Sequence, residues 1–233
     1  MDQPVCVVVG VGPGNGASIA RRFAAGGHRV ALLARSTAFG ERLAATLDGA
    51  RFYACDVANE SDVVAVFGRV SMDLGEPDVV VYNAGSGVWG DVETITTASF
   101  EAAWRVNALG ALVTARQVIP AMRRRGRGAI ILIGATASRR GMPRTAAFAP
   151  AKAAQRSLAE SMARHLWPAG IHVALVIVDG VVDLERTRKT MPDKPDTFFV
   201  NPDDVAATAF WLSQQPRSAW AFEIEARPFG ETW

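Results

Sequence analysis

Short apolar runs alternate with amphipathic stretches along nearly the whole chain, and this alternation restricts the fold more than any other feature. The apolar runs are rich in Val, Ile and Leu, which is typical of parallel strands covered on both faces. The expected strands are Val5–Val9, Arg29–Leu33, Arg51–Ala54, Asp78–Tyr82, Ala129–Ile133, His172–Val178 and Ala221–Ala226. The expected helices lie in Ser18–Ala25, Ser61–Met72, Ser99–Arg124, Ala146–Trp167 and Pro202–Ser213. The pattern predicts an α/β protein with a doubly wound parallel sheet of about seven strands and helices on both faces.

The length and composition of the chain favour a single folding unit. Its 233 residues are 49% apolar and 21% charged, which is enough to bury one sizeable core. No internal repeat, low-complexity tract or Pro/Gly-rich linker marks a boundary, so we expect one domain over residues 1–233. The longest stretch without a clear helix or strand pattern is 179–201, and its length predicts a lid over a substrate site.

The charge balance and the positions of cysteine and histidine argue against several classes of function. With 25 basic and 23 acidic residues the net charge is +2, too balanced to favour nucleic acid as a partner. Cys6 and Cys55 lie in apolar runs without a spacing motif, and the three histidines lack metal-ligand spacing, so we expect neither a disulfide nor a metal site. No stretch reaches about 18 apolar residues and no leader pattern opens the chain. We therefore expect a cytoplasmic protein with no membrane partner.

A glycine-rich turn follows the first expected strand and directly precedes a helix pattern. It reads Gly10-Val11-Gly12-Pro13-Gly14-Asn15-Gly16. Glycine permits a tight turn, lets the backbone approach a pyrophosphate, and leaves the N–H groups of the helix start pointing at the anion. Because the strand before it and the helix after it are the context that this motif requires, we expect a dinucleotide-binding turn here.

Four features, taken in order along the chain, resemble the short-chain dehydrogenase/reductase superfamily. They are the Gly10-x-x-x-Gly14-x-Gly16 spacing, Asn83-Ala84-Gly85 after the fourth strand, Asn107 in the next helix, and Lys152 in the helix after the fifth strand. The resemblance spans nearly the whole chain. It implies a Rossmann-like fold, a nicotinamide cofactor and an oxidoreductase that acts on a small molecule. It also implies a homodimer or homotetramer built on the two long helices after the fourth and fifth strands.

The resemblance further implies roles for individual residues. The glycine-rich turn would hold the cofactor pyrophosphate, Asp56 the adenine, and Asn83–Gly85 would form the floor of the nicotinamide site. Asn107 would order a water molecule, and Lys152 would hold the nicotinamide ribose. The full set of expected cofactor contacts is Gly10, Gly12, Gly14, Asn15, Gly16, Arg35, Ser36, Asp56, Val57, Asn83, Ala84, Gly85, Lys152 and Gly180.

The end of the second strand predicts which nicotinamide cofactor binds. Sites specific for NAD place Asp or Glu there to hold the ribose 2′-hydroxyl, whereas a 2′-phosphate is repelled by a carboxylate and attracted by arginine. This chain has Ala34-Arg35-Ser36 at that point. We therefore expect NADP(H), with Arg35 and Ser36 on the 2′-phosphate. The alternative is that Arg35 is an ordinary solvated residue at a helix start.

The two positions where the superfamily carries its catalytic hydroxyls hold no hydroxyl in this chain. Phe148 lies four residues before Lys152, at the position of the usual tyrosine. Ala135, thirteen residues before Phe148, stands at the position of the usual serine. Asp179 also replaces the usual proline before Gly180. This pattern resembles a divergent subgroup of the superfamily that has Phe in place of Tyr and retains the lysine.

The missing tyrosine limits the substrates that such a site reduces. Hydride transfer to a ketone generates an alkoxide, and its protonation by a positioned acid contributes about 10²–10⁴-fold to the rate. An iminium ion already carries its proton, so its reduction yields a neutral amine and needs orientation rather than an acid. We therefore expect an NADPH-dependent reductase of imines or iminium ions, with activated alkenes and ketones next.

Several further residues are candidates for the substrate site. An apolar pocket, or else loop packing, is expected from Trp89, Met142, Phe148, Phe198 and Phe199. Asp179 and Asp183 are expected at the mouth of the site, where a carboxylate attracts a cationic substrate, or else they are solvated lid residues. The candidate substitute proton donors are Thr136, Ser138, Thr145 and Lys152, and for Lys152 this requires that burial lower its pKa.

Two other classes of function stay open at this point. A non-redox enzyme on the same scaffold, such as a cyclase or a lyase, would use Asp179, Asp183 or Lys152. A catalytically silent protein would only bind the cofactor. The retained Asn107 and Lys152 favour the reductase, because a silent subunit has no chemical need for either side chain.

Overall fold

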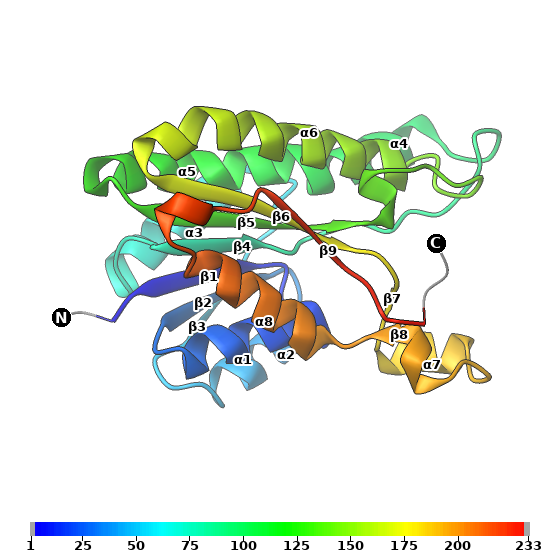
Figure 1. Ribbon diagram of the computed structural model, residues 1–233, viewed down its shortest axis with the longest axis horizontal. Coiled ribbons are helices and arrows are strands. Elements are labelled where there is room, and N and C mark those ends of the chain that lie inside the picture. Colours follow the sequence, from blue (N-terminus) through cyan, green and yellow to red (C-terminus); the bar gives the residue numbers. More distant parts are fainter. Residues whose placement is uncertain (1–2, 231–233) are drawn as a thin grey trace.

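The computed structural model describes residues 3–230, which form one large parallel sheet with helices on both faces (Figure 1). The sheet has seven strands in the order β3-β2-β1-β4-β5-β6-β9, and each neighbouring pair is parallel. Its strands are β1 (Val5–Val9), β2 (Arg29–Ala34), β3 (Arg51–Ala54), β4 (Val79–Tyr82), β5 (Gly128–Ala135), β6 (Ile171–Val178) and β9 (Glu223–Ala226). Because the chain returns to the centre of the sheet between β3 and β4, the order is that of a Rossmann-like doubly wound fold. The fold class predicted from the sequence is confirmed.

The helices form a layer on each face of the sheet (Figure 1). One layer, below the sheet in the view, contains α1 (Asn15–Ala25), α2 (Thr37–Ala44) and α8 (Pro202–Ser213). The opposite layer contains α3 (Glu60–Asp73), α5 (Gly110–Arg125) and α6 (Phe148–Leu166), and α4 (Thr97–Trp104) packs against α6. Right-handed crossovers between parallel strands place consecutive helices in this way.

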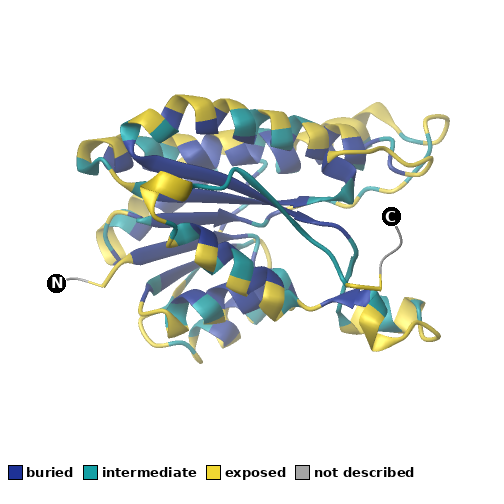
Figure 2. Ribbon diagram, in the orientation of Figure 1, coloured by how far each residue is buried: buried dark blue, intermediate teal, exposed yellow. Residues whose placement is uncertain are grey.

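Burial explains why the apolar runs became strands. Figure 2 shows the sheet as the buried centre of the molecule, with exposed residues on the outer sides of the helices. All eight residues of β6 and all five of β1 are buried. Each fully buried Val, Ile or Leu side chain stabilises the fold by about 1.5–3 kcal/mol relative to an exposed one. Two apolar clusters, one on each face of the sheet, result from these contacts.

The helix expected over Ser99–Arg124 is divided into two. A π-helical turn at Arg105–Leu109 separates α4 from α5. At the start of α5 a side chain on Gly110 would collide with the Tyr82 hydroxyl. That hydroxyl donates a hydrogen bond to the Val106 carbonyl at 2.5 Å, inside the π-helical turn. The wider turn therefore places the helix around a buried tyrosine, and it is also the turn that carries Asn107.

Short regular elements occur in the segment 179–201, where the sequence showed no clear pattern. They are β7 (Val181–Val182), α7 (Glu185–Thr190) and β8 (Phe199–Val200), and β7 pairs with β8 in parallel. In Figure 1 this segment lies at one end of the molecule, beyond the ends of the sheet strands. Within the described residues, no helix has the length and apolar character needed to cross a membrane.

Candidate active site

The carboxyl ends of the central strands meet at one edge of the sheet. Val9 of β1 lies beside Leu33 of β2 and Tyr82 of β4, and Ala135 of β5 lies beside Val178 of β6. The residues that follow these strands therefore come together in space, although they are far apart in the sequence. Ligands of open α/β sheets bind in the crevice outside this edge.

The glycine-rich turn is locked to the loop after β4. Gly10 has a φ of +90°, and a side chain on it would collide with the backbone of Ala84. The Asn83 carboxamide donates to the Gly10 carbonyl at 2.7 Å. A Cβ at Gly12, in contrast, would meet nothing within 4 Å. The turn thus approaches its neighbours closely at one glycine and leaves open space at another.

The N-terminus of α1 is free of side-chain capping. Gly14 precedes the helix and Asn15 begins it, with no side-chain cap bond and no acidic residue in the first turn. The Asn15 Oδ1 is buried without a hydrogen-bond partner among the described residues. Leu184, in the segment 179–201, covers Gly14, because its Cδ2 lies 2.5 Å from where a Cβ on that glycine would be. A helix N-terminus of this kind attracts an anion.

Arg35 and Ser36 are exposed at the carboxyl end of β2. No carboxylate of the described residues forms an ion pair with Arg35, so its guanidinium is available to a ligand. Beyond β3, the Asp56 carboxylate accepts a hydrogen bond from the Ala58 N–H at 3.0 Å. Val57 is buried next to it, against the start of α5.

Among the cationic side chains of the site, Lys152 has the pKa that is shifted furthest from its ordinary value. It is 4% exposed, and its Nζ donates to the Ile133 carbonyl at 2.9 Å and to the Gln155 carboxamide oxygen at 3.0 Å. Burial lowers the pKa of Lys152 from 10.5 to about 7. None of the described carboxylates forms an ion pair with it. Lys152 therefore exchanges a proton readily near neutral pH.

Asn107 lies beside Lys152 across Gly85. The Asn107 carboxamide donates to the Ala103 carbonyl at 2.8 Å and to the Ser86 carbonyl at 3.3 Å. Its Oδ1 is buried and has no partner among the described residues. A Cβ on Gly85 would lie 3.3 Å from this oxygen and 3.7 Å from Lys152 Nζ. The structure thus brings Asn107, Gly85 and Lys152 together at one point.

Positions 148 and 135 present only apolar groups. Phe148 begins α6, and its ring lies 5.5 Å from the ring of Trp89, centroid to centroid. Ala135 ends β5, and its N–H donates to the Ser138 hydroxyl oxygen at 3.1 Å.

Three hydroxyl groups lie close in sequence to positions 135 and 148, where the usual serine and tyrosine are missing, and each forms a hydrogen bond with another group of the protein. Thr136 donates to the Asp179 carboxylate at 2.5 Å, and Thr145 donates to the Met142 carbonyl at 2.9 Å. Ser138 is buried and accepts the hydrogen bond from Ala135. The hydroxyl protons of Thr136 and Thr145 are therefore engaged within the protein, whereas the Ser138 hydroxyl is engaged as an acceptor.

A family model described as short chain dehydrogenase matches residues 4–195. The chain belongs to the short-chain dehydrogenase family.

Three similar proteins illustrate this family membership. A solved short-chain dehydrogenase from Rhodopseudomonas palustris is 34% identical and covers 97% of this chain and 99% of its own, with a TM-score of 0.83. A metagenomic short-chain oxidoreductase, solved in complex with NADP, is 29% identical and covers 99% of both chains, also with a TM-score of 0.83. The inactive 2-(S)-hydroxypropyl-CoM dehydrogenase 2 of Xanthobacter autotrophicus is 29% identical over 208 residues, which are 83% of this chain and 90% of that protein.

The residues of this short-chain dehydrogenase fit the nicotinamide cofactor that the family uses. The open space at Gly12 and the uncapped start of α1 suit a pyrophosphate. The unpartnered Oδ1 atoms of Asn15 and Asn107 are acceptors for ligand or water hydroxyls. The exposed Arg35 lies where the adenosine ribose is expected.

The two carboxylates expected at the mouth of the site are engaged by arginines. Asp179 is 3% exposed, and Arg227 donates to it at 2.6 Å and Arg140 at 3.4 Å. Asp183 accepts two hydrogen bonds from Arg188, at 2.7 and 2.8 Å, which lower its pKa. Both carboxylates hold protein segments together in this structure.

The aromatic residues expected to line the pocket fall into two groups. Trp89 is 62% exposed and covers Phe148, while Met142 is exposed on the neighbouring loop. Phe198 and Phe199 pack edge to face against each other in the segment 179–201. The structure therefore places Trp89 beside Phe148 and leaves the two phenylalanines in that segment.

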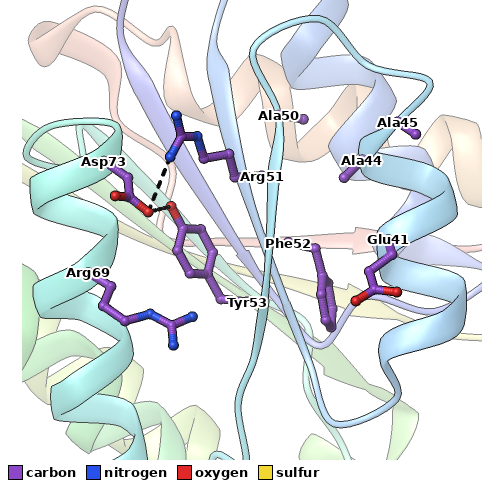
Figure 3. A pocket seen from close by; sticks show the side chains of 9 residues that line it. All are labelled: Glu41, Ala44, Ala45, Ala50, Arg51, Phe52, Tyr53, Arg69 and Asp73. Atoms are coloured by element: carbon purple, nitrogen blue, oxygen red, sulfur yellow. Dashed lines mark hydrogen bonds and ion pairs between the residues drawn. The ribbon is translucent and has the colours of Figure 1, made fainter.

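A separate cavity of about 490 Å³ lies beside the edge strand β3 and contains none of the predicted site residues (Figure 3). Four of its side chains engage one another. The Tyr53 hydroxyl donates to Asp73 at 2.9 Å, Arg51 pairs with the same carboxylate at 3.5 Å, and Arg69 lies over the Tyr53 ring. The candidate active site therefore remains at the carboxyl edge of the sheet.

Gln155 is the residue that sequence reasoning missed. It lies one helical turn after Lys152, is fully buried, and accepts a hydrogen bond from Lys152 Nζ. The signal available in the sequence was its position three residues after Lys152, which places the two side chains on the same face of a helix.

Proposed function

We propose that this protein is an NADPH-dependent reductase that lacks a tyrosine acid and acts preferentially on carbon–nitrogen double bonds. It thus corresponds to the subgroup of the family with Phe in place of Tyr. The observation that carries the proposal is the combination of apolar groups at Phe148 and Ala135 with an intact Asn107 and Lys152.

NADPH is favoured over NADH by the residues at the end of β2. Arg35 is exposed and has no carboxylate partner among the described residues, and the position usual for an acidic residue holds none. A guanidinium binds the planar oxygens of a 2′-phosphate in a bidentate manner. The similar metagenomic oxidoreductase was solved with NADP.

The apolar wall of the site favours a substrate that needs no acid. When bound, NADPH supplies the hydride. Phe148 and Trp89 would form an apolar wall at one side of the acceptor, and their ring faces would attract a cationic substrate by about 0.5–2 kcal/mol. Reduction of an iminium ion leaves a neutral amine, whereas reduction of a ketone leaves an alkoxide that this wall does not stabilise.

A catalytically silent protein is the second candidate, and one observation favours it. A similar protein, the dehydrogenase from Xanthobacter autotrophicus, is described as inactive. Against it stands the cost of burying Lys152, which a protein without chemistry has no reason to retain. A non-redox enzyme that uses Asp179 or Asp183 is disfavoured because arginines engage both carboxylates, which leaves Lys152 alone for such chemistry.

Restoring the two hydroxyls tests the proposal. The double variant Phe148→Tyr, Ala135→Ser is expected to increase ketone reduction by about 10²–10⁴-fold, the usual contribution of a positioned acid. The matched control is Phe148→Leu with Ala135→Ser, which restores only one hydroxyl and is expected to show little gain. The proposal is wrong about these positions if the double variant binds NADPH and gains no ketone activity.

A further inference from the structure

Gln155 and Ile133 hold the ammonium of Lys152 from two sides. Gln155 Oε1 accepts from Lys152 Nζ at 3.0 Å, and the Ile133 carbonyl on β5 accepts at 2.9 Å. Both acceptors are fully or almost fully buried, and both are neutral. The position of Nζ is therefore set by these two hydrogen bonds rather than by a carboxylate.

Two fixed acceptors leave one tetrahedral position on Lys152 Nζ. An ammonium has three N–H donors, so one N–H remains when two are engaged. A neutral amine has two N–H groups, so its lone pair takes that remaining position. Gly85, whose Cβ would lie 3.7 Å from Nζ, is exposed and puts no side chain of its own into this space, which Asn107 Oδ1 borders from the other side. A proton can therefore leave or join Lys152 at one defined place.

The other end of Gln155 shows that the residue is not placed for packing. Its Nε2 is buried without a hydrogen-bond partner among the described residues. An unpaired buried donor is unfavourable for folding, and leucine would fill a similar volume without it. The hydrogen bond to Lys152 is the favourable contact that the glutamine makes at this position.

We propose that Gln155 is the positioning residue of Lys152, and that it directs the remaining N–H of the ammonium to the nitrogen of a neutral imine bound beside Gly85. Once that proton has left, the Nζ lone pair would accept from the ribose hydroxyl that the resemblance assigns to Lys152. The inference rests on the proposed function. In this step the Nζ–H bond breaks and an N–H bond forms on the substrate, which becomes an iminium ion. Lys152 is left as a neutral amine and regains its proton from water. The site thereby generates the cationic acceptor that its apolar wall favours.

The chain allows a direct measurement of Lys152, because it contains only three lysines, Lys152, Lys189 and Lys194. Protein labelled with ¹³C at the lysine Cε gives three signals, and Lys152→Gln identifies the one that belongs to Lys152. Its titration midpoint in the wild type is expected at about pH 7, the value to which burial lowers the pKa of this group. The measurement needs no substrate.

Three variants test the role of Gln155 in this titration. Gln155→Leu removes an acceptor of the ammonium and is expected to lower the Lys152 midpoint by about one pH unit. Gln155→Glu places a carboxylate there and is expected to raise it by about one to three pH units. Gln117→Leu is the matched control and is expected to leave the midpoint unchanged, because among the described residues Gln117 donates only to the Val113 carbonyl of its own helix.

An unchanged Lys152 midpoint in both folded Gln155 variants would overturn the proposal. The pH profile of imine reduction is expected to move with the midpoint, up in Gln155→Glu and down in Gln155→Leu. Profiles that stay in place while the midpoints move would show that Lys152 is not the proton source, and this also overturns the proposal. Shifted midpoints in a protein that reduces no imine would refute the proposed function alone and leave the positioning of Lys152 by Gln155 established.

Discussion

Lys152 makes the free energy of unfolding depend on pH in a way that its replacement would remove. Burial lowers the pKa of Lys152 from 10.5 in the unfolded chain to about 7 in the folded protein. Between these values the unfolded state binds the proton and the folded state does not, so stability rises with pH. A shift of about 3.5 units corresponds to about 5 kcal/mol, which is lost in full below about pH 7 and recovered towards pH 10.5.

Comparison with Lys152→Met isolates this effect from all other titrations. Urea unfolding, followed by the fluorescence of the six tryptophans, gives the free energy of unfolding of both proteins at each pH. From pH 7 to pH 9, the free energy of unfolding of the wild type is expected to rise by about 2 kcal/mol more than that of the variant. In the variant, the Ile133 and Gln155 acceptors lose their donor. This shifts its free energy of unfolding by the same amount at every pH and does not change how the difference between the two proteins depends on pH. Parallel curves over that range would refute the assignment of Lys152 as a buried, readily neutralised amine.

Three further perturbations follow from the structure. Gly10→Ala is expected to lower the free energy of unfolding by more than about 2 kcal/mol, because Gly10 has a positive φ and a close backbone neighbour. Gly68→Ala, in open space on α3, is expected to raise the free energy of unfolding by about 0.5–1 kcal/mol. Equal effects of the two variants in urea unfolding would contradict this. Asp179→Asn is expected to lower the free energy of unfolding by about 3 kcal/mol and Asp183→Asn by about 1 kcal/mol or less, since Asp179, unlike Asp183, is deeply buried. Imine turnover is expected to be retained in Asp183→Asn, and its loss in a stable variant would show that this carboxylate takes part in the reaction. Arg35→Ala is expected to raise KM for NADPH about tenfold or more and to leave KM for NADH nearly unchanged. Steady-state kinetics with both cofactors checks this, and an unchanged KM for NADPH would contradict it.

The central strands were predictable because their burial leaves a continuous apolar signal. The runs at Val5–Val9 and His172–Val178 are covered on both faces, so every position except His172 holds an apolar side chain. The glycine-rich turn and Asn83 were likewise predictable, because topology brings the carboxyl ends of β1 and β4 together. The family prediction made from these residues is confirmed, while the subgroup with Phe in place of Tyr stays a prediction.

Features that depend on single contacts were not predictable. Nothing in the periodicity of Ser99–Arg124 shows the π-helical turn, which depends on the contact between Tyr82 and the helix. The eight residues of α2 are too few for a clear amphipathic pattern. Asp179 reads as a loop carboxylate until the fold brings Arg227, 48 residues later, against it.

Consumption of NADPH by the purified protein with a bicyclic imine and the ketone of the same shape tests the central claim most directly. Equal shape keeps the binding contacts comparable, so the two rates differ mainly in the need for an acid. The account predicts turnover of the imine and little or none of the ketone across neutral to mildly alkaline pH. Equal turnover of both would show that the site has a proton donor in place of the missing tyrosine, and silence with both despite tight NADPH binding would contradict the reductase.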